Sequence, residues 1–365
     1  MKILQICNHF YPCVGGIESV VEDLCKNLIE LGHQSDVACL NTCAYTKERL
    51  PALEEYQKIK IHRLLYFNLK FYKPSFGVFK LLKEYDLIHV HGIGFFSDFV
   101  AITKPIHKKP MVLNTHGGVF HTKKLRLLKK LYFIWNRFSL GAFEKVIADS
   151  RSDEATFSRI CSGIEHIPNG ISVDEFQVKR RPEPFTLLYI GRISRNKRID
   201  LLIETVAVLK KSQPGVKLNV VGEDWEGIQK ELEELALKKG LGKNIEFLGK
   251  IDRREVVEHI SKAAFFVSAS QYEGFGISVL EAMSAGCPVV LNDIPAFREF
   301  VNHGENGFLV DFSDCESTAA LLFDLMEKDV SGISKEAVQT AARYDWKNVV
   351  EKIERVYEEA IKEGP

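Results

Sequence analysis

Two glutamates, separated by seven residues that include a Gly-Phe-Gly segment, form the most informative motif of the sequence. Glu273 precedes the glycines and Glu281 follows them, after an apolar stretch that ends near Ser268. A strand, a glycine turn and a helix start expose backbone N–H groups that can bind an anion such as phosphate. Because carboxylates repel phosphate, we expect each glutamate to reach past the anion to hydroxyl groups, such as those of a sugar and a ribose. A capped turn with Glu281 on a solvated helix face is the alternative interpretation.

A basic segment after another strand-like stretch could neutralise a diphosphate. Arg192 and Lys197 lie in the sequence GRISRNK, directly after the strand predicted for residues 186–190. Arg192 can form a forked pair of hydrogen bonds to phosphate oxygens, and Lys197 can add a point charge. The sequence contains no Asp-x-Asp motif that could hold a divalent ion beside the diphosphate, so we expect no metal and no cofactor. A solvated basic loop is the alternative for this segment taken alone.

The N-terminal half has a glycine loop of its own. Gly15 and Gly16 lie between the strand predicted for residues 2–6 and a helix predicted for residues 17–31. Backbone without side chains can approach a ligand closely at such a loop. The GxGxxG fingerprint of a dinucleotide site is absent, and an ordinary turn is a serious alternative.

Two more candidate residues follow predicted strands of this half. His116 comes after the strand at residues 111–114 and precedes two glycines, so its imidazole could donate to a sugar hydroxyl or a backbone oxygen. Ser150 precedes a predicted helix, and we expect it to be the N-cap of that helix, whether or not it also contacts a substrate. We assign His89 and His91, at the end of another strand, packing or supporting roles.

The elements that must position these residues alternate between short apolar runs and amphipathic segments. We predict strands at residues 2–6, 35–40, 59–65, 87–90, 111–114, 145–148, 186–190, 217–221, 245–248, 264–268 and 289–291. In the second half we predict helices at residues 199–211, 225–239, 253–262, 277–285 and 346–362. This alternation is typical of α/β domains whose parallel sheets are covered on both faces.

A charged, proline-containing stretch between Asp174 and Pro184 interrupts the alternation. We therefore predict two Rossmann-like, doubly wound domains, at residues 1–175 and 185–345. Ligands of such sheets bind beyond the carboxyl ends of the strands, so we expect the two halves to face each other across one cleft.

Composition excludes several classes of protein. The 365 residues suffice for two domains, and 49 basic against 49 acidic residues leave no net charge to attract nucleic acid. The 8 cysteines include no CxxC pair, which favours a reduced, cytoplasmic setting. We expect no secretory signal and no membrane span, because no window reaches about 18 uninterrupted apolar residues.

These motifs resemble those of the retaining, GT-B-fold glycosyltransferases of family four, over nearly the whole chain. The matching residues are Gly15-Gly16 with Glu18, His116, Ser150, Pro168-Asn169-Gly170, Gly191-Arg192 with Lys197, and Glu273 with Glu281. The resemblance implies that the C-terminal half binds a nucleotide sugar and the N-terminal half an acceptor, and that helix 346–362 packs back on the first domain. It implies that Arg192 and Lys197 hold the diphosphate. It also implies that Glu281 holds the ribose, and that Glu273 and His116 hold the donor sugar.

The same resemblance implies backbone contacts to phosphate or sugar from Phe275, Gly276 and Ile277. The remaining donor-binding candidates are Gly274, Ser150, Gly15 and Gly16. The expected reaction retains the anomeric configuration: the acceptor hydroxyl attacks from the face of the departing diphosphate, and a leaving phosphate oxygen accepts its proton.

A narrower similarity concerns residues 115–122, THGGVFHT. They are similar to the His-Gly-Gly-Phe-Phe-His-Thr stretch of bacterial α-mannosyltransferases that extend diphosphopolyprenyl-linked sugars. This favours GDP-mannose over a UDP-sugar as donor, and a glycan or polyprenyl-diphosphate-linked glycan as acceptor. A nucleotide-sugar epimerase, a sugar phosphorylase and a non-catalytic nucleotide-sugar binding protein are the alternatives, and a nicotinamide dehydrogenase is a weaker one.

The segment from Lys123 to Arg137 combines basic residues with leucines and aromatics. Such a stretch can lie on an anionic membrane surface, where a lipid-linked acceptor would be presented. We therefore predict peripheral association with the inner face of a membrane; a helix packed on its own domain, with a solvated basic side, is the alternative.

Overall fold

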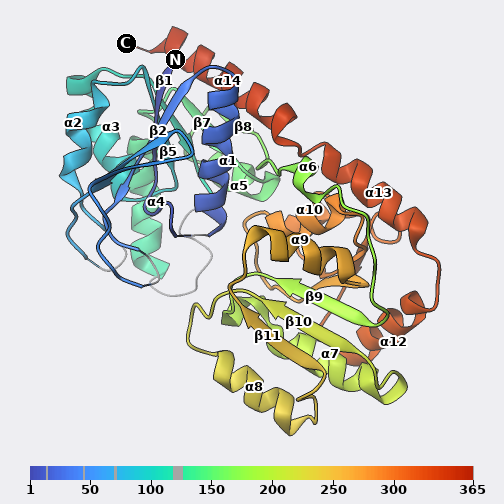
Figure 1. Ribbon diagram of the computed structural model, residues 1–365. Helices are drawn as coiled ribbons and strands as arrows, with labels where there is room; N and C mark the ends of the chain where they lie inside the picture. The colour runs from blue at the N-terminus through green and yellow to red at the C-terminus, as the bar shows by residue number, and fades with distance from the viewer. Residues whose placement is uncertain (14, 44–45, 70–71, 118–125, 365) are drawn as a thin grey trace. The chain divides into compact units, whose positions relative to one another are not determined.

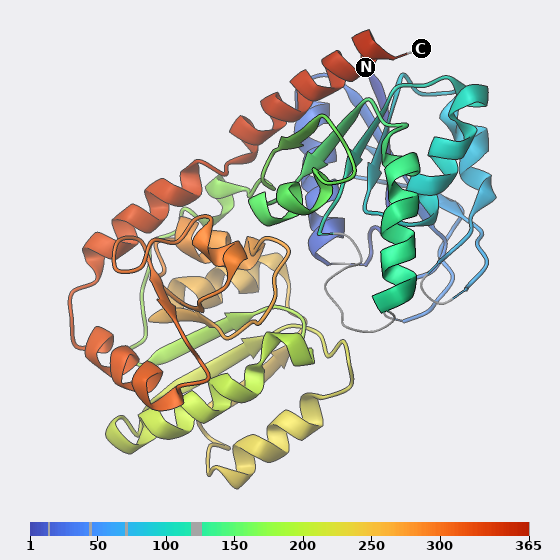
Figure 2. The same ribbon diagram turned by 180° about the vertical axis from the view of Figure 1, so that it is seen from behind.

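The computed structural model describes residues 1–13, 15–43, 46–69, 72–117 and 126–364 (Figures 1 and 2). This described chain divides into two compact units. The first comprises Met1–Gly170 together with Trp346–Pro365, and the second comprises Ile171–Asp345.

Within its described residues, the first unit is built on an eight-stranded sheet with the order β3-β4-β2-β1-β5-β6-β7-β8. The strands are β1 (Lys2–Ile6), β2 (Gln34–Leu40), β3 (Leu53–Tyr56), β4 (Ile59–Leu64), β5 (Leu87–His91), β6 (Met111–Asn114), β7 (Lys145–Ala148) and β8 (Ile164–His166). Among these described strands, β3 runs antiparallel to β4 and the other neighbours are parallel. The strand order reverses beside β1, so the loops after β1 and β5 open at the switch point of the sheet.

Helices cover both faces of this sheet. They are α1 (Gly16–Glu30), the 3-10 helix η1 (Phe76–Val78), α2 (Phe79–Leu82), α3 (Phe95–His107), α4 (Arg126–Leu140), α5 (Arg151–Phe157) and α14 (Trp346–Glu363). Side chains of β1 alternate between the faces: Leu4 and Ile6 join the core under α2 and α3, whereas Gln5 contacts Tyr357 of α14. Helices α1 and α14 pack side by side (Figure 1), and α3 and α4 lie on the opposite face (Figure 2).

The second unit contains a six-stranded parallel sheet, counted over its described residues, in the order β11-β10-β9-β12-β13-β14. Its strands are β9 (Thr186–Ile190), β10 (Lys217–Val221), β11 (Ile245–Gly249), β12 (Phe265–Ser268), β13 (Val289–Asn292) and β14 (Phe308–Val310). Strands β9 and β12 are hydrogen-bonded neighbours at the point where the strand order reverses. The loops that follow them therefore emerge side by side at one edge of the sheet.

Two helical layers cover this second sheet. Its helices are α6 (Val173–Phe176), η2 (Arg195–Lys197), α7 (Ile199–Ser212), α8 (Gln229–Lys238), α9 (Arg253–Lys262), α10 (Ile277–Ser284), α11 (Pro295–Arg298), α12 (Cys315–Met326) and α13 (Ser331–Ala342). Helices α6, α9, α10 and α13 share one hydrophobic core with the sheet, and α7, α8 and α12 share the other.

The division between the units differs from the predicted boundary at Asp174 to Pro184. The structure divides the chain at Gly170, and the charged stretch lies within the second unit. Arg180 anchors it there, because its guanidinium donates to the carbonyl of Gly286 at 2.6 Å and to that of Ala263. A run of charges and prolines thus marks an anchored connection and not the boundary itself.

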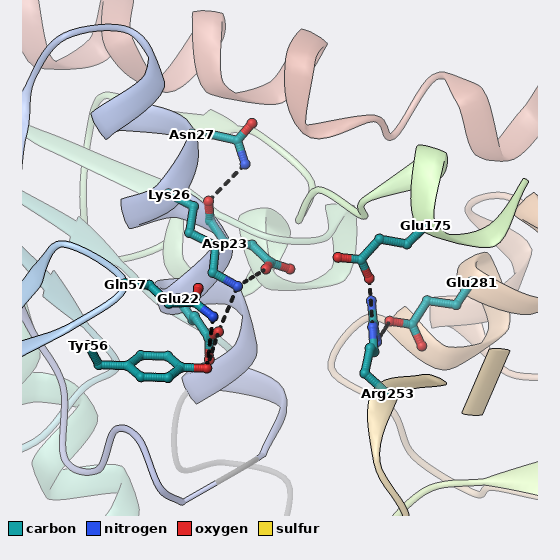
Figure 3. Close-up of polar contacts among 9 residues, drawn as sticks. All are labelled: Glu22, Asp23, Lys26, Asn27, Tyr56, Gln57, Glu175, Arg253 and Glu281. Atoms are coloured by element: carbon teal, nitrogen blue, oxygen red, sulfur yellow. Dashed lines mark hydrogen bonds and ion pairs between the residues drawn. The ribbon is translucent and has the colours of Figure 1, made fainter. Parts of the chain in front are cut away.

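The predicted start of one helix at Trp225 is also wrong. Helix α8 begins at Gln229, because Gly227 adopts a φ of 72° that no helix contains. The carboxylate of Asp224 instead accepts the N–H groups of Ile228 at 3.0 Å and Gln229 at 3.1 Å. The antiparallel strand β3 was not predicted either. It packs toward α1, and the Tyr56 hydroxyl donates to Glu22 at 3.4 Å (Figure 3).

Candidate active site

Lys197 and Glu273 form an ion pair at the carboxyl edge of the second sheet. Lys197 Nζ lies 2.6 Å from Glu273 Oε2, and the two side chains are only 12% and 18% exposed. The hydroxyl of Ser270 donates to the other carboxylate oxygen at 2.8 Å. The glutamate that follows β12 is therefore oriented by a cation from the loop after β9 and by a hydroxyl from its own loop.

The two loops that carry this pair are hydrogen-bonded to each other. The N–H of Gln271 donates to the carbonyl of Asn196 at 2.8 Å, and the Asn196 amide donates to the carbonyl of Tyr272 at 3.2 Å. Such contacts hold the lysine and the glutamate in register before any ligand arrives. Preorganised groups of this kind suit the stabilisation of charge that develops during a reaction.

The Gly-Phe-Gly segment forms the turn that starts α10. Phe275 is 5% exposed and packs against Phe300 and Tyr344, so its side chain anchors the turn in the core. Gly276 precedes the helix with a φ of 111°, and a Cβ there would lie 3.0 Å from the ring of Phe297. The N-terminus of α10 is held beside β9, because the Ser278 hydroxyl donates to the carbonyl of Ile190 at 3.1 Å. Ile277 is the first residue of the helix, where backbone N–H groups have no partner within the helix, and Gly274 lies two residues before the N-cap Gly276.

Glu281 does not lie on a solvated helix face. The residue is 6% exposed, and its Oε1 accepts a hydrogen bond from Arg253 Nη1 at 2.6 Å. Arg253 Nε donates to Glu175 at 2.8 Å, and Figure 3 shows Arg253 between the two carboxylates. The alternative interpretation of the motif, a capped turn with a solvated glutamate, is therefore wrong for this residue.

Arg192 pairs with an aromatic ring. Its guanidinium carbon lies 5.1 Å from the centre of the Trp225 ring, in the neighbouring loop after β10. A bridge between Ile193 and Asp224 joins these loops, and the Tyr189 hydroxyl donates to the carbonyl of Arg192 at 3.2 Å. Arg192 is exposed, so its charge is available at the same sheet edge as Lys197.

The first unit has a cavity of about 200 Å³ at the switch point of its own sheet. The residues that line it come from the loops after β1, β5 and β6 and from the start of α1. They are Asn8, His9, Ile17, Glu18, His91, Gly92, Ile93, Thr115 and His116. Burial, together with the nearby charge of Lys73, lowers the pKa of His9 to about 4, so this ring is neutral near pH 7.

His116 is engaged by side chains at both ring nitrogens. Nδ1 lies 2.6 Å from Asp149 Oδ2, and Nε2 lies 3.0 Å from His91 Nδ1. Its side chain is only 4% exposed, so the residue presents mainly its backbone to the cavity, and its φ of 46° is unusual for a residue other than glycine. The sequence left a sugar hydroxyl or a backbone oxygen open as the partner of this imidazole, and in the structure the ring contacts Asp149 and His91.

A buried polar chain continues from His91 to the C-terminal helix. His91 Nε2 lies 2.8 Å from Gln5 Oε1, and the Gln5 amide nitrogen lies 3.4 Å from the Tyr357 hydroxyl. That hydroxyl lies 2.7 Å from His89 Nδ1. Burial lowers the pKa of His89 to about 3 and holds the pKa of His91 well below its usual value, so both rings act as neutral hydrogen-bonding groups.

Ser150 is the N-cap of α5, as predicted: its hydroxyl accepts the N–H of Asp153 at 3.2 Å. Asp153 itself turns back toward the loop after β6, where its carboxylate accepts the Thr115 hydroxyl and the N–H of Gly117. Burial raises the pKa of Asp153 to about 6, against the opposing effect of these donors. The cap thus orders the loop that carries His116.

Gly15 and Gly16 start α1. Gly15 is extended, with a φ of −151° that any residue can adopt, and a Cβ on Gly16 would meet no atom within 4 Å. The fold around Gly16 therefore leaves room for a side chain.

Part of the predicted membrane segment lies outside the described residues. Residues 118–125, which include most of the THGGVFHT stretch as well as Lys123, lie outside them. In the described part of α4, Ile134, Trp135 and Phe138 are exposed by 56%, 43% and 72%. Among the helices that the structure describes, none is long and apolar enough to cross a membrane.

Several residues of the site were not predicted. Four residues each contact a predicted site residue but lie outside the sequence motif that contains that site residue. They are Arg253, Trp225, Ser270 and Asp149. Asp149 carried a usable signal, because a carboxylate directly after β7 must lie beside the end of the adjacent strand β6. The others became visible only through tertiary contacts.

Comparison with known proteins places the chain in a family. Residues 14–175 match the family described as Glycosyltransferase Family 4, and residues 171–345 match the family described as Glycosyl transferases group 1. The chain is 32% identical to the GDP-mannose:cellobiosyl-diphosphopolyprenol alpha-mannosyltransferase of Xanthomonas oryzae pv. oryzae, covering 99% of this chain and 97% of that protein. The protein of the same name from Komagataeibacter xylinus is 31% identical, covering 99% of this chain and 94% of its own. Sucrose-phosphate synthase from Thermosynechococcus elongatus superposes with a TM-score of 0.81 at 21% identity, over 98% of each chain.

Two α/β domains, built on mainly parallel sheets, define the GT-B fold of this chain. The chain belongs to the family-four glycosyltransferases, and it is a hexosyltransferase. These findings favour that activity over the epimerase, phosphorylase, binding-protein and dehydrogenase alternatives.

Proposed function

We propose that the enzyme transfers mannose from GDP-mannose to a polyprenyl-diphosphate-linked glycan, with retention of the anomeric configuration. One observation carries the choice of substrates: proteins that match this chain over nearly their whole length are named for that donor and for a diphosphopolyprenol-linked acceptor. A UDP-sugar is the next donor to test.

The donor binds at the carboxyl edge of the second sheet in this proposal. Lys197 and Arg192 neutralise the diphosphate. The backbone N–H groups of residues 275–277, in the turn that leads into α10, add further donors. Glu273 holds a hydroxyl of the mannose, and Glu281 holds the ribose. The ion pair between Lys197 and Glu273 supports these roles. A bound phosphate would replace Glu273 as the partner of Lys197, and a sugar hydroxyl would replace Lys197 as the partner of Glu273. The cations serve where other enzymes use a metal, so we propose that no metal or other cofactor is needed.

The first unit supplies the acceptor side and part of the sugar contact. Its cavity lies beside His116 and Glu18, and the open space around Gly16 supports a close approach of ligand to backbone. His116 contacts the donor sugar through its backbone, or through its imidazole once the ring exchanges His91 for a sugar hydroxyl. Ser150 holds the loop of His116 through the cap of α5.

The chemical step follows from these positions. The C–O bond between the anomeric carbon and the phosphate breaks as the acceptor oxygen forms its bond on the same face. The departing phosphate oxygen takes the proton of the acceptor hydroxyl. Arg192, Lys197 and the start of α10 stabilise the negative charge that develops on the leaving diphosphate.

Two measurements test the proposal. In a thermal shift panel of GDP, UDP, ADP, GDP-mannose, UDP-glucose and UDP-N-acetylglucosamine, GDP and GDP-mannose should raise the melting temperature most, because they bind the folded state. Transfer from GDP-mannose to a polyprenyl-diphosphate-linked disaccharide should then proceed in EDTA and yield an α-linked product by NMR. An inverted product, or activity that EDTA abolishes and magnesium restores, contradicts the proposal.

We also propose that the enzyme works at a membrane surface, where its lipid-linked acceptor resides. Support comes from two exposed aromatic residues of α4: Trp135 lies in the basic segment that ends at Arg137, and Phe138 directly follows it. The enzyme should sediment with anionic vesicles at low salt. Phe138→Ala should weaken this binding, whereas Leu237→Ala, which removes a side chain of similar exposure from the second unit, should not. Equal binding of both variants contradicts the proposed surface.

A further inference from the structure

Arg253 joins two carboxylates that come from different helices. It is the first residue of α9, and its Nη1 and Nε donate to Glu281 on α10 at 2.6 Å and to Glu175 on α6 at 2.8 Å (Figure 3). The guanidinium carbon also lies 4.6 Å from the centre of the buried Phe176 ring. Three elements therefore fix one guanidinium in place.

The partners of Arg253 differ sharply in their exposure. The Glu281 side chain is 8% exposed, whereas the side chains of Glu175 and Arg253 are each 46% exposed. A carboxylate buried to this extent is expensive to keep ionised unless a charge is paired with it. Arginine is suited to that task, because it keeps its proton and holds a fixed geometry. The contact with Glu175 keeps the cation directed at Glu281.

The contact leaves part of Glu281 for other partners. Arg253 occupies Oε1, so Oε2 can accept a hydroxyl group. Without its arginine, the Glu281 carboxylate would be free to turn. Glu281 is therefore arranged to accept a hydrogen bond, and Arg253 holds it in place.

We propose that Arg253 is a positioning residue that keeps Glu281 directed at the ribose of the donor nucleotide. In this role it sets the preference for ribonucleotides over nucleotides without ribose hydroxyls. The inference rests on the proposed ribose contact of Glu281, and it adds the group on which that contact depends.

Calorimetric titration with GDP and with 2′,3′-dideoxy-GDP tests the proposal on the full-length enzyme. The wild type should prefer GDP. Arg253→Met should weaken GDP binding by about 10- to 100-fold, the size of a lost hydrogen bond to a charged group. Its affinity for the dideoxy nucleotide should change by less than about twofold, because that ligand has no hydroxyl for Glu281 to accept. Arg253→Lys, which retains the charge, should recover part of the preference.

A matched control separates positioning from the loss of a positive charge. Arg254 is the next residue of α9 and is also exposed, so Arg254→Met makes the same change of charge one position away. It should leave both affinities nearly unchanged. Glu175→Gln should reduce the preference for GDP less than Arg253→Met does, because it removes only the outer contact. If Arg253→Met fails to fold, the comparison is made with Arg253→Lys.

The possible failures are distinguishable. If the wild type prefers GDP and Arg253→Met keeps that preference, or weakens both ligands equally, the role of Arg253 is overturned while the ribose contact stands. If the wild type does not distinguish the two nucleotides, or binds neither, the proposed role of Glu281 fails and the role of Arg253 fails with it.

Discussion

Lys197 Nζ and Glu273 Oε2 lie 2.6 Å apart, so the cation and the carboxylate proposed to bind opposite ends of the donor satisfy each other. A diphosphate that takes Lys197 must therefore compete with Glu273, and a sugar hydroxyl that takes Glu273 must compete with Lys197. Binding of the intact nucleotide sugar replaces both contacts at once. A free sugar or a free phosphate replaces only one and leaves the other group without its partner.

Lys197→Ala and Glu273→Gln should each lower kcat by about 10²- to 10³-fold, the usual effect of removing one preorganised charged group from a site. Because the two residues act on one ligand, the double variant should lose less than the product of the single losses. Steady-state kinetics measures both effects, with Lys210→Ala on α7 as a control. A single variant with near-normal kcat contradicts the assignment.

Trp225 should report the occupancy of the diphosphate site. Its ring is 44% exposed and lies 5.1 Å from the Arg192 guanidinium, which a bound diphosphate would draw away. Titration with GDP should therefore change the tryptophan fluorescence. Trp225→Phe should abolish the change and Trp135→Phe should retain it. A signal that persists without Trp225 places the diphosphate elsewhere.

Tyr357→Phe should destabilise the protein by about 1–3 kcal/mol, because it leaves buried groups on His89 and Gln5 without their partner. Urea unfolding followed by circular dichroism measures the loss. Tyr56→Phe is the matched control: its hydroxyl reaches Glu22 at 3.4 Å on the surface of α1, and the change should cost less than about 0.5 kcal/mol. Equal effects of the two substitutions would refute the importance of the buried chain.

Asp153 should make a distinct contribution to the pH dependence of stability. Its pKa of about 6 in the folded protein lies above the ordinary 3.8, so the folded state binds its proton more tightly than the unfolded state does. The resulting stabilisation is complete below about pH 4 and is lost as the pH rises through 6. Two pKa units correspond to roughly 3 kcal/mol.

Comparison with Asp153→Asn isolates this contribution, because asparagine does not titrate and the other groups are common to both proteins. The free energy of unfolding of the wild type, relative to the variant, should fall between pH 4 and pH 7. A constant difference across that range would mean that Asp153 titrates normally.

Gly170→Ala should destabilise the first unit by about 1–3 kcal/mol, because the added Cβ would lie 2.4 Å from a carbon of the buried Trp346 ring. Gly16→Ala should leave the stability nearly unchanged, since its Cβ would meet nothing within 4 Å. If the backbone of Gly16 contacts a ligand, as we propose, this variant should nevertheless lose transfer activity. Full activity of Gly16→Ala removes that residue from the site.

Strands were predicted from sequence more accurately than connections. Strands β1, β6, β7, β9 and β10 have the predicted bounds, because burial on both faces makes a parallel strand rich in apolar residues. The start of α8 was misplaced because Gly227 and the side chain of Asp224 decide it, and neither is part of a periodic pattern. The edge strand β3 was missed, because its exposed residues carry little apolar signal.

The sequence by itself determined the βα alternation, the cap at Ser150 and the Glu273–Glu281 window, since each depends on residues close together along the chain. Only the tertiary structure decided which of these groups meet. Lys197 reaches Glu273 because β9 and β12 are neighbours in the sheet, and Arg253 reaches Glu281 because α9 packs beside α10. Tyr357 contacts His89 across 268 positions. Strand order and helix packing arise from the burial of whole faces, so no local pattern specifies such pairs.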